Sequence, residues 1–218
     1  MSEQQIAKLA GSITEHQSNL SAMSVEDRQW AIQNTTLAIG LFADAVKSRN
    51  VKSKTATPFW ITIDDATIGV NLGSTPNLPF AGALVEYHIG NGWVVVEKRA
   101  DGLYINGRKV ILYLSRRQQN GKSLKGYELR EELMGKPVLN ANVLDALYEN
   151  VHLIPEAWKK DELGNTRYIF FWATLYRLAF GLLFVRYLSF PGGAWHRRYR
   201  WLGGSAWRSG SPSASLAN

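Results

Sequence analysis

Residues 167–190, RYIFFWATLYRLAFGLLFVRYLSF, decide the fold because they are compatible with two very different structures. Eighteen of them, 168–185, contain a single arginine and are long and apolar enough for a membrane-spanning helix. Arg177 would then lie near the centre of the bilayer, where a charge is costly. The enrichment in Phe, Tyr, Trp and Ile and the break at Gly181 favour β-strands instead. We therefore predict strands at 167–177 and 182–190, with the membrane helix as the alternative.

Residues 58–115 have the two-residue apolar period of strands. The pairs Asp64-Asp65 and Asn106-Gly107 predict two hairpin turns. A third turn signal, Gly90-Asn91-Gly92, joins the predicted strands 84–89 and 93–99. This region is expected to be a short-stranded antiparallel unit.

Helical spacing of apolar residues occurs on both sides of that unit. It is found in the first fifty residues and again at 122–135 and 141–152. Three segments are expected: a helical N-terminal segment at 1–57, a β-rich region at 58–121, and a third region at 122–218 whose tail is 178–218. The N-terminal helices would serve to display or oligomerise the rest of the chain.

The composition is globular, with 45% hydrophobic and 20% charged residues in a chain of 218. There is no cysteine, which excludes disulfides, thiolate metal sites and thiol nucleophiles. The four histidines do not approach the spacing of a local metal site, so no metal or cofactor is expected. The net charge of +7 belongs to residues 163–218, which contain seven arginines and no lysine or acidic residue.

No motif in the chain indicates catalysis. Asn120-Gly121-Lys122-Ser123 resembles the end of a phosphate-binding loop, but Arg116 occupies the position where that motif requires glycine. His88 and His152 are better explained as packing or capping residues than as catalysts. We predict that the protein is not an enzyme.

The tail has an unusual composition. Lys, Glu, Gln and Met together account for 32 of residues 1–177, and none of the four occurs in residues 178–218. Ser, Gly, Arg, Leu, Ala and Phe fill the space between regularly placed tryptophans.

This pattern resembles the target proteins of diversity-generating retroelements. The resemblance lies in LKGYELREELMGKPVLNANVLDALYENVHLIPEAWKKDELGNTRYIFFWATLYR (124–177), followed by VRYL (185–188), GGAW (192–195), WL (201–202), Trp207 and a terminal SASLA, and it covers about residues 100–218. It implies a variable C-terminal region within a C-type-lectin-type fold. The expected fold class is therefore α+β: a C-type-lectin-like mixed domain with N-terminal helices and short antiparallel strands.

The resemblance also accounts for the composition of the tail. In that family, error-prone reverse transcription replaces adenines, chiefly in asparagine codons, and the products cannot encode Lys, Glu, Gln, Met or Trp. Tryptophans in the tail would then be constant. The residues that match constant scaffold positions are Gly192, Gly193, Trp195, Trp201 and Trp207. The residues that match variable, ligand-binding positions are Leu178, Ala179, Phe180, Ser189, Phe190, Pro191, His196, Arg198, Arg200, Gly203, Gly204, Ser205, Arg208, Gly210 and Ser211.

The function implied by the resemblance is non-enzymatic binding of an unknown protein or surface ligand, with specificity varied through the tail. The alternative is a nucleic-acid-binding protein, because arginines such as Arg197, Arg198 and Arg200 can contact phosphates while aromatic rings stack on bases. A membrane is not an expected partner. The first residues do not form a secretion signal, so the default expectation is a cytoplasmic protein.

Overall fold

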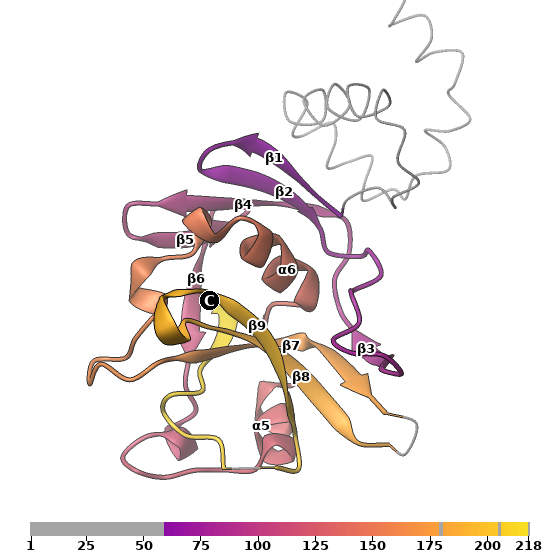
Figure 1. Ribbon diagram of the computed structural model, residues 1–218, viewed down its shortest axis with the longest axis vertical. Coiled ribbons are helices and arrows are strands. Elements are labelled where there is room, and N and C mark those ends of the chain that lie inside the picture. The colour runs from indigo at the N-terminus through magenta and orange to yellow at the C-terminus, as the bar shows by residue number, and fades with distance from the viewer. Residues whose placement is uncertain (1–58, 179–180, 205, 218) are drawn as a thin grey trace, which may run out of the picture. The chain divides into compact units, whose positions relative to one another are not determined.

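The computed structural model describes residues 59–178, 181–204 and 206–217 (Figure 1). The helices expected within 1–57, and their role in display or oligomerisation, lie outside the described residues. Within the described ranges the chain forms ten strands, two α-helices and four short 3₁₀ helices. The strands are β1 (Trp60–Asp64), β2 (Thr67–Asn71), β3 (Leu84–His88), β4 (Trp93–Arg99), β5 (Gly102–Ile105), β6 (Arg108–Tyr113), β7 (Tyr168–Arg177), β8 (Leu183–Ser189), β9 (His196–Trp201) and β10 (Ser213–Leu216). The helices are η1 (Arg116–Gln118), α5 (Gly126–Leu133), α6 (Ala141–Glu149), η2 (Val151–Leu153), η3 (Glu156–Trp158) and η4 (Pro191–Gly193).

The strands join into one curled sheet in the order β1-β2-β4-β5-β6-β10-β7-β8-β9, and β3 pairs with β7 outside this path. All pairs are antiparallel except β10 with β7. Figure 1 shows the sheet curling around α6 as a half-barrel. Strands from the predicted β-rich region and from the tail thus share one sheet.

The predicted α+β, C-type-lectin-like fold class is wrong. The described part of the chain is mostly β, with ten strands against two α-helices. Both helices form where helical spacing was found, but they are short. The segment 122–135 yields eight helical residues before Gly135 turns the backbone to a φ of +78°. The segment 141–152 is α-helical only to Glu149 and continues as the 3₁₀ turn η2.

The strands predicted at 167–177 and 182–190 are confirmed as β7 and β8, which pair directly. Eight of the ten residues of β7 are buried, because side chains on both of its faces are covered. A strand covered on both faces shows a continuous apolar run rather than alternation, which is why this segment resembled a membrane helix. Across the residues described, no helix combines the length and apolar character needed to span a membrane.

Two of the three predicted hairpins form. β1 pairs with β2, and β5 pairs with β6 through Asn106 and Gly107, whose φ angles of 48° and 76° suit a tight hairpin turn. The hairpin expected at Gly90-Asn91-Gly92 is wrong, because β3 pairs with β7 and β4 pairs with β2 and β5. At Gly90 the chain passes so close to Leu72 and Asn140 that a Cβ atom would lie 2.7 Å from Leu72 Cβ.

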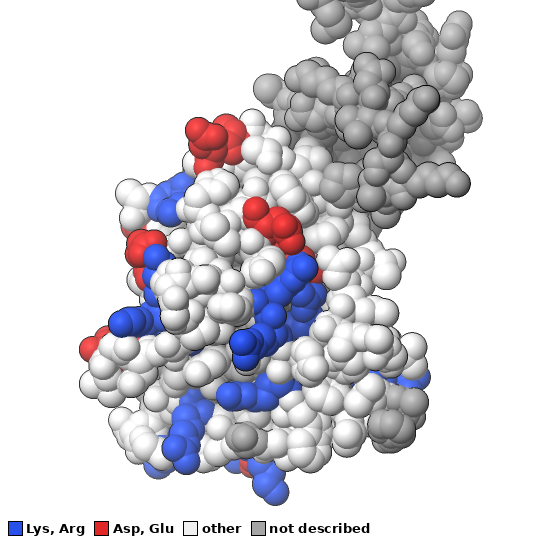
Figure 2. Space-filling view, viewed as in Figure 1, with Lys and Arg blue, Asp and Glu red and all other residues white. Residues whose placement is uncertain are grey.

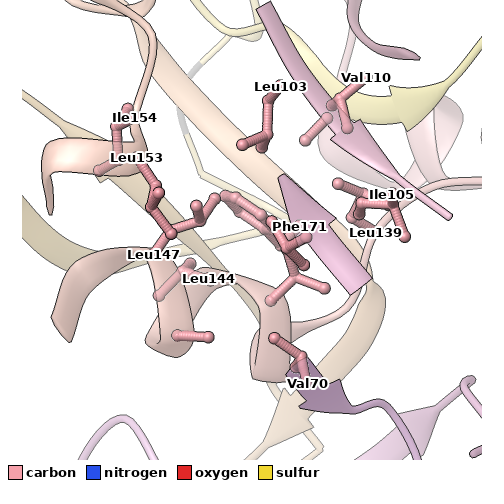
Figure 3. Packing of buried hydrophobic residues seen from close by; sticks show 14 of the residues in the cluster. Val70, Leu103, Ile105, Val110, Leu139, Leu144, Leu147, Leu153, Ile154 and Phe171 are labelled. Atoms are coloured by element: carbon pink, nitrogen blue, oxygen red, sulfur yellow. The ribbon is translucent and has the colours of Figure 1, made fainter. Parts of the chain in front are cut away.

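The sheet separates two clusters of buried side chains. The first lies on the α6 side and includes Leu144, Leu147, Ile169 and Phe171. Figure 3 shows Phe171 in the middle of this cluster, with the two leucines of α6 on one side of it. The second cluster lies on the other face, where Phe170 and Trp172 of β7 meet Leu129 of α5 and Trp207 of the tail. Successive side chains of β7 therefore pack into opposite clusters, because side chains alternate between the two faces of a strand.

Candidate ligand-binding surface

The strand β9 lies at the end of the sheet order and contains the largest concentration of charge in the tail. Its described pairing partner is β8, in the register Phe184↔Trp201 to Ser189↔His196. The sequence of β9, HRRYRW, places an arginine, a histidine or an aromatic ring at every position. Figure 2 shows Lys and Arg side chains gathered over this strand. Because side chains alternate along a strand, β9 presents two different faces.

One face of β9 presents His196, Arg198 and Arg200. Arg198 is exposed and stands opposite Tyr187 of β8, whereas His196 and Arg200 are half-buried. The guanidinium carbon of Arg200 lies 5.1 Å from the centroid of the Trp207 ring, within the range of cation–π attraction. Arg200 also donates a hydrogen bond from Nη1 to Ser211 Oγ at 3.3 Å.

Tyr187 of β8 lies on the same face of the sheet, and its pKa is shifted there. Burial raises the pKa of Tyr187, and the positive charges of Arg200 and Arg198 oppose this increase. Tyr187 is half-buried, with its ring centroid 4.9 Å from that of Phe170 and 5.6 Å from that of Tyr168. This face therefore consists of cationic groups lying over an aromatic base.

The opposite face of β9 is tied down by a buried ion cluster. Asp145 of α6 is fully buried and accepts hydrogen bonds from Arg186 Nη2 at 2.5 Å and from Arg186 Nη1 at 2.8 Å. Arg197 of β9 donates to the same carboxylate at 3.0 Å and to Glu149 at 3.2 Å, and Asn77 donates to it at 3.0 Å. Burial alone would lower the pKa of Arg186, but its hydrogen bonds to Asp145 and the charge of that carboxylate raise it.

Aromatic contacts support this second face. The ring of Tyr199 lies 4.6 Å from that of Phe80 and 5.7 Å from that of Phe184, measured between centroids. Tyr199 is nevertheless 43% exposed, and Trp201 is 41% exposed. A small hollow of about 210 Å³ opens here, between the 77–79 loop and the strands β8 and β9. Its described lining residues are Asn77, Leu78, Pro79, Arg186, Arg197, Arg198 and Tyr199.

The backbone of the tail is held by residues outside it. Leu124 and Trp207 exchange two backbone hydrogen bonds, at 2.9 and 3.2 Å, and the Gly126 amide donates to the Leu202 carbonyl at 3.1 Å. The amides of Tyr168 and Phe170 donate to the carbonyls of Gly210 and Pro212 at 2.8 and 2.9 Å. These bonds involve main-chain atoms, so a change of tail side chain does not remove them directly.

The residues predicted to be variable are distributed unevenly over the structure. Twelve of them lie in the described part of the chain, and Ala179, Phe180 and Ser205 lie outside it. Ser189 and Ser211 are buried, at 1% and 4% exposure. The exposed or half-buried remainder is Leu178, Phe190, Pro191, His196, Arg198, Arg200, Gly203, Gly204, Arg208 and Gly210.

The structure brings some of these positions together and separates others. His196, Arg198 and Arg200 of β9 share one face of the sheet with Ser189 of β8, and Arg200 donates a hydrogen bond to Ser211. Leu178 lies at the other end of β8 from Phe190 and Pro191, so the whole set spans the length of that strand.

The residues predicted as scaffold differ in burial. Trp207 is fully buried, and its ring centroid lies 4.3 Å from that of Phe170. Trp195 is half-buried with its ring 5.2 Å from that of Phe190, whereas Trp201 is exposed. Gly192 and Gly193 are exposed in η4, with φ angles of 63° and 86° that favour glycine.

Several residues that support this surface could not be identified from the sequence. Asn77, Phe80 and Asp145 come from segments far from the tail, and no local pattern connects them to it. No strand was predicted over 196–201. A strand there would have placed Arg197 and Tyr199 on one face and His196, Arg198 and Arg200 on the other.

Within residues 59–178, 181–204 and 206–217, no three His, Asp or Glu side chains come together as metal ligands. His88 lies between Thr174 Oγ1, at 2.7 Å, and the Leu72 carbonyl, at 2.8 Å. No family model, curated protein or solved structure matches this chain.

Proposed function

We propose that this chain is a non-enzymatic binding protein whose tail, centred on β9, recognises a protein or surface ligand and is diversified by a retroelement. One observation carries the proposal. Most of the described positions expected to vary reach the surface, on a backbone that is bonded to residues outside the tail. The absence of Lys, Glu, Gln and Met from 178–218 adds independent support.

The geometry suits a surface whose side chains change. Backbone pairing with β8 positions one edge of β9. The ion pairs of Asp145 with Arg186 and Arg197 anchor the face of β9 that packs against α6. A binding surface tolerates substitution when a separate framework maintains its backbone. Exposed positions such as Arg198 and Arg208 can therefore change with little effect on the fold.

The present side chains favour an acidic partner. Arg198 and Arg208 are exposed cations, and Tyr199 and Trp201 are exposed rings of β9. Arg, Tyr and Trp are the residues that most often dominate the energy of protein interfaces. A protein segment with carboxylate and apolar side chains would complement this surface.

The decisive experiment is long-read sequencing of the genomic neighbourhood of the coding sequence. The proposal expects a near-copy of codons 178–218 beside a reverse-transcriptase gene, differing from the coding copy only where the near-copy carries adenine. A neighbourhood with neither the copy nor the reverse transcriptase would refute diversification.

Nucleic-acid binding is the second candidate, favoured by the three arginines and two exposed rings of β9. It is weaker because Arg197 is already paired with Asp145 and Glu149, and Arg200 lies against aromatic rings. Binding of single-stranded DNA should weaken by about 0.7 log units per log unit of salt for each phosphate contacted. Binding that is insensitive to salt, or unchanged when Arg197, Arg198 and Arg200 are replaced together, would rule it out.

A further inference from the structure

A second hollow lies between β3, β7 and the segment that follows α5. Its volume is about 380 Å³, towards the lower end of the range of about 300–1,000 Å³ that small-molecule sites occupy. The described residues that line it are Tyr87, Ile89, Arg130, Leu133, Met134, Gly135, Lys136, Pro137, Val138, Trp172, Ala173 and Leu175. We refer to it as the α5–β7 cavity.

The walls of the α5–β7 cavity are mostly apolar. Leu133, Trp172 and Leu175 are buried members of the second core cluster, so the cavity reaches down to the core. Large apolar side chains stand exposed at its rim: Tyr87 at 41%, Ile89 at 56% and Met134 at 73%. Single exposed apolar residues are ordinary, but a group of them around one hollow marks a site for an apolar ligand.

The segment that closes the cavity is held in place by its own backbone. The amides of Met134, Lys136 and Val138 donate to the carbonyls of Glu131, Leu133 and Lys136 at 3.2, 3.0 and 2.8 Å. Gly135 supplies the left-handed turn between them, with a φ of +78°. The cavity is therefore preformed, as most small-molecule sites are.

The described charged residues that line the cavity are all cationic. Arg130 and Lys136 are among the described lining residues, and no Asp or Glu is. Neither cation forms an ion pair with any acidic side chain in the described ranges. Lys136 Nζ lies 5.0 Å from the centroid of the Tyr113 ring. The nearby acid on β3, Glu86, is paired with Arg177 at 2.8 Å.

We infer that the α5–β7 cavity binds a small amphiphilic carboxylate, with its apolar body against Leu133, Trp172 and Leu175 and its carboxylate towards Arg130. An apolar hollow selects the hydrocarbon part, and the unopposed cations select the negative head group. A medium-chain fatty acid has both properties at a size that suits this volume. The site is separate from β9, so this inference does not depend on the proposed function.

The test is calorimetric titration of the full chain with octanoate, octanol and octylammonium, which share one hydrocarbon body and differ in charge. Octanoate should bind most tightly and octylammonium most weakly. Replacing Arg130 by Met should weaken octanoate binding about tenfold and leave octanol binding unchanged, because only the charged partner is lost. Arg116→Met is the matched control, since Arg116 is exposed on η1 and is not among the lining residues.

A second pair of variants tests the charge without touching a buried residue. Ile89 is exposed on the rim, so Ile89→Glu and Ile89→Lys remove the same apolar surface and add opposite charges. The glutamate should weaken octanoate binding and the lysine should strengthen it. Equal affinities for the three ligands, no binding of octanoate, or parallel effects of the two Ile89 variants would each overturn the inference, and none of these results bears on the tail.

Discussion

Replacing Asp145 by Asn should be among the most damaging single changes in the described part of the chain. The substitution keeps the shape of the side chain and removes its charge, leaving Arg186 at 4% exposure without a counter-charge. Asp145 accepts four hydrogen bonds, three of them from arginine. Breaking a buried pair from one side costs about 3–5 kcal/mol, because the remaining charge stays desolvated.

The measurement is thermal and urea denaturation followed by far-ultraviolet circular dichroism. A loss of about 3–5 kcal/mol corresponds to a fall in Tm of roughly 6–20 °C for a chain of this size. The matched control is Glu149→Gln, which makes the same chemical change one turn further along α6 against the same Arg197. Glu149 is about half exposed, so this control should cost less than about 1 kcal/mol.

A double substitution separates the lost pair from the buried charge. Replacing Asp145 by Leu together with Arg186 by Met removes both charges and fills the space with apolar groups. This double variant should be more stable than Asp145→Asn alone, because neither partner is left unpaired. If Asp145→Asn lowers Tm no more than Glu149→Gln does, the cluster does not support β9 and the reasoning is refuted.

Three further predictions concern the tail and the sheet. Trp207→Ala should destabilise the protein by about 3–5 kcal/mol in urea denaturation, because removing a fully buried ring leaves a cavity. Trp201→Ala is the control and should cost clearly less, because that ring is exposed. Arg198→Ala should change the free energy of unfolding by no more than about 0.5 kcal/mol. Arg200→Ala should cost more, because it loses its cation–π contacts. Equal effects of the two substitutions would contradict the distinction between an exposed Arg198 and a packed Arg200. Burial, and then a hydrogen bond to a glutamate of α5, raises the pKa of Tyr113 to about 12, so its contribution to stability is present below pH 10 and is lost as the pH rises from 10 to 12. Tyr113→Phe should flatten that fall in denaturation measured across this pH window, and an unchanged slope would exclude the assignment.

The strands were predictable where the local pattern was sufficient. β7 and β8 follow from an apolar run rich in aromatic and branched residues with Arg177 at its centre. The hairpin at Asn106-Gly107 follows from a dipeptide that accepts positive φ angles. In each case the information lies within a few residues, so a single sequence reveals it.

Pairing between distant strands was not predictable. β3 lies directly before a strong turn signal, yet its partner is β7, with His88 opposite Thr174. A turn signal reports the direction of the chain and carries no information about which strand lies alongside. The fold class was wrong for a related reason. It depended on how far α5 and α6 extend and on the lectin-type fold that the family resemblance implied.

The candidate surface was predictable only in part. Its arginines and tryptophans stand out in the composition of the tail, but no strand was predicted over 196–201, and only that strand separates Arg198 and Arg200 from Arg197. The role of Asp145 was not predictable, because a carboxylate in the middle of α6 would ordinarily be assigned to the exposed face of a helix. Its contacts with Arg186 and Arg197, supplied by strands much later in the chain, and with Asn77 compensate for its burial.

The positions expected to vary therefore fall into two physical classes. Arg198 and Arg208 are exposed, and their side chains have no described hydrogen bond or ion pair, so replacing them changes the surface alone. Arg200 lies over aromatic rings of the second core cluster, and Ser189 and Ser211 are buried, so replacing any of the three also changes packing. A diversified surface of this kind would draw its variety mainly from the first class. Its affinity would then rest on exposed side chains carried by an edge strand that α6 holds in position.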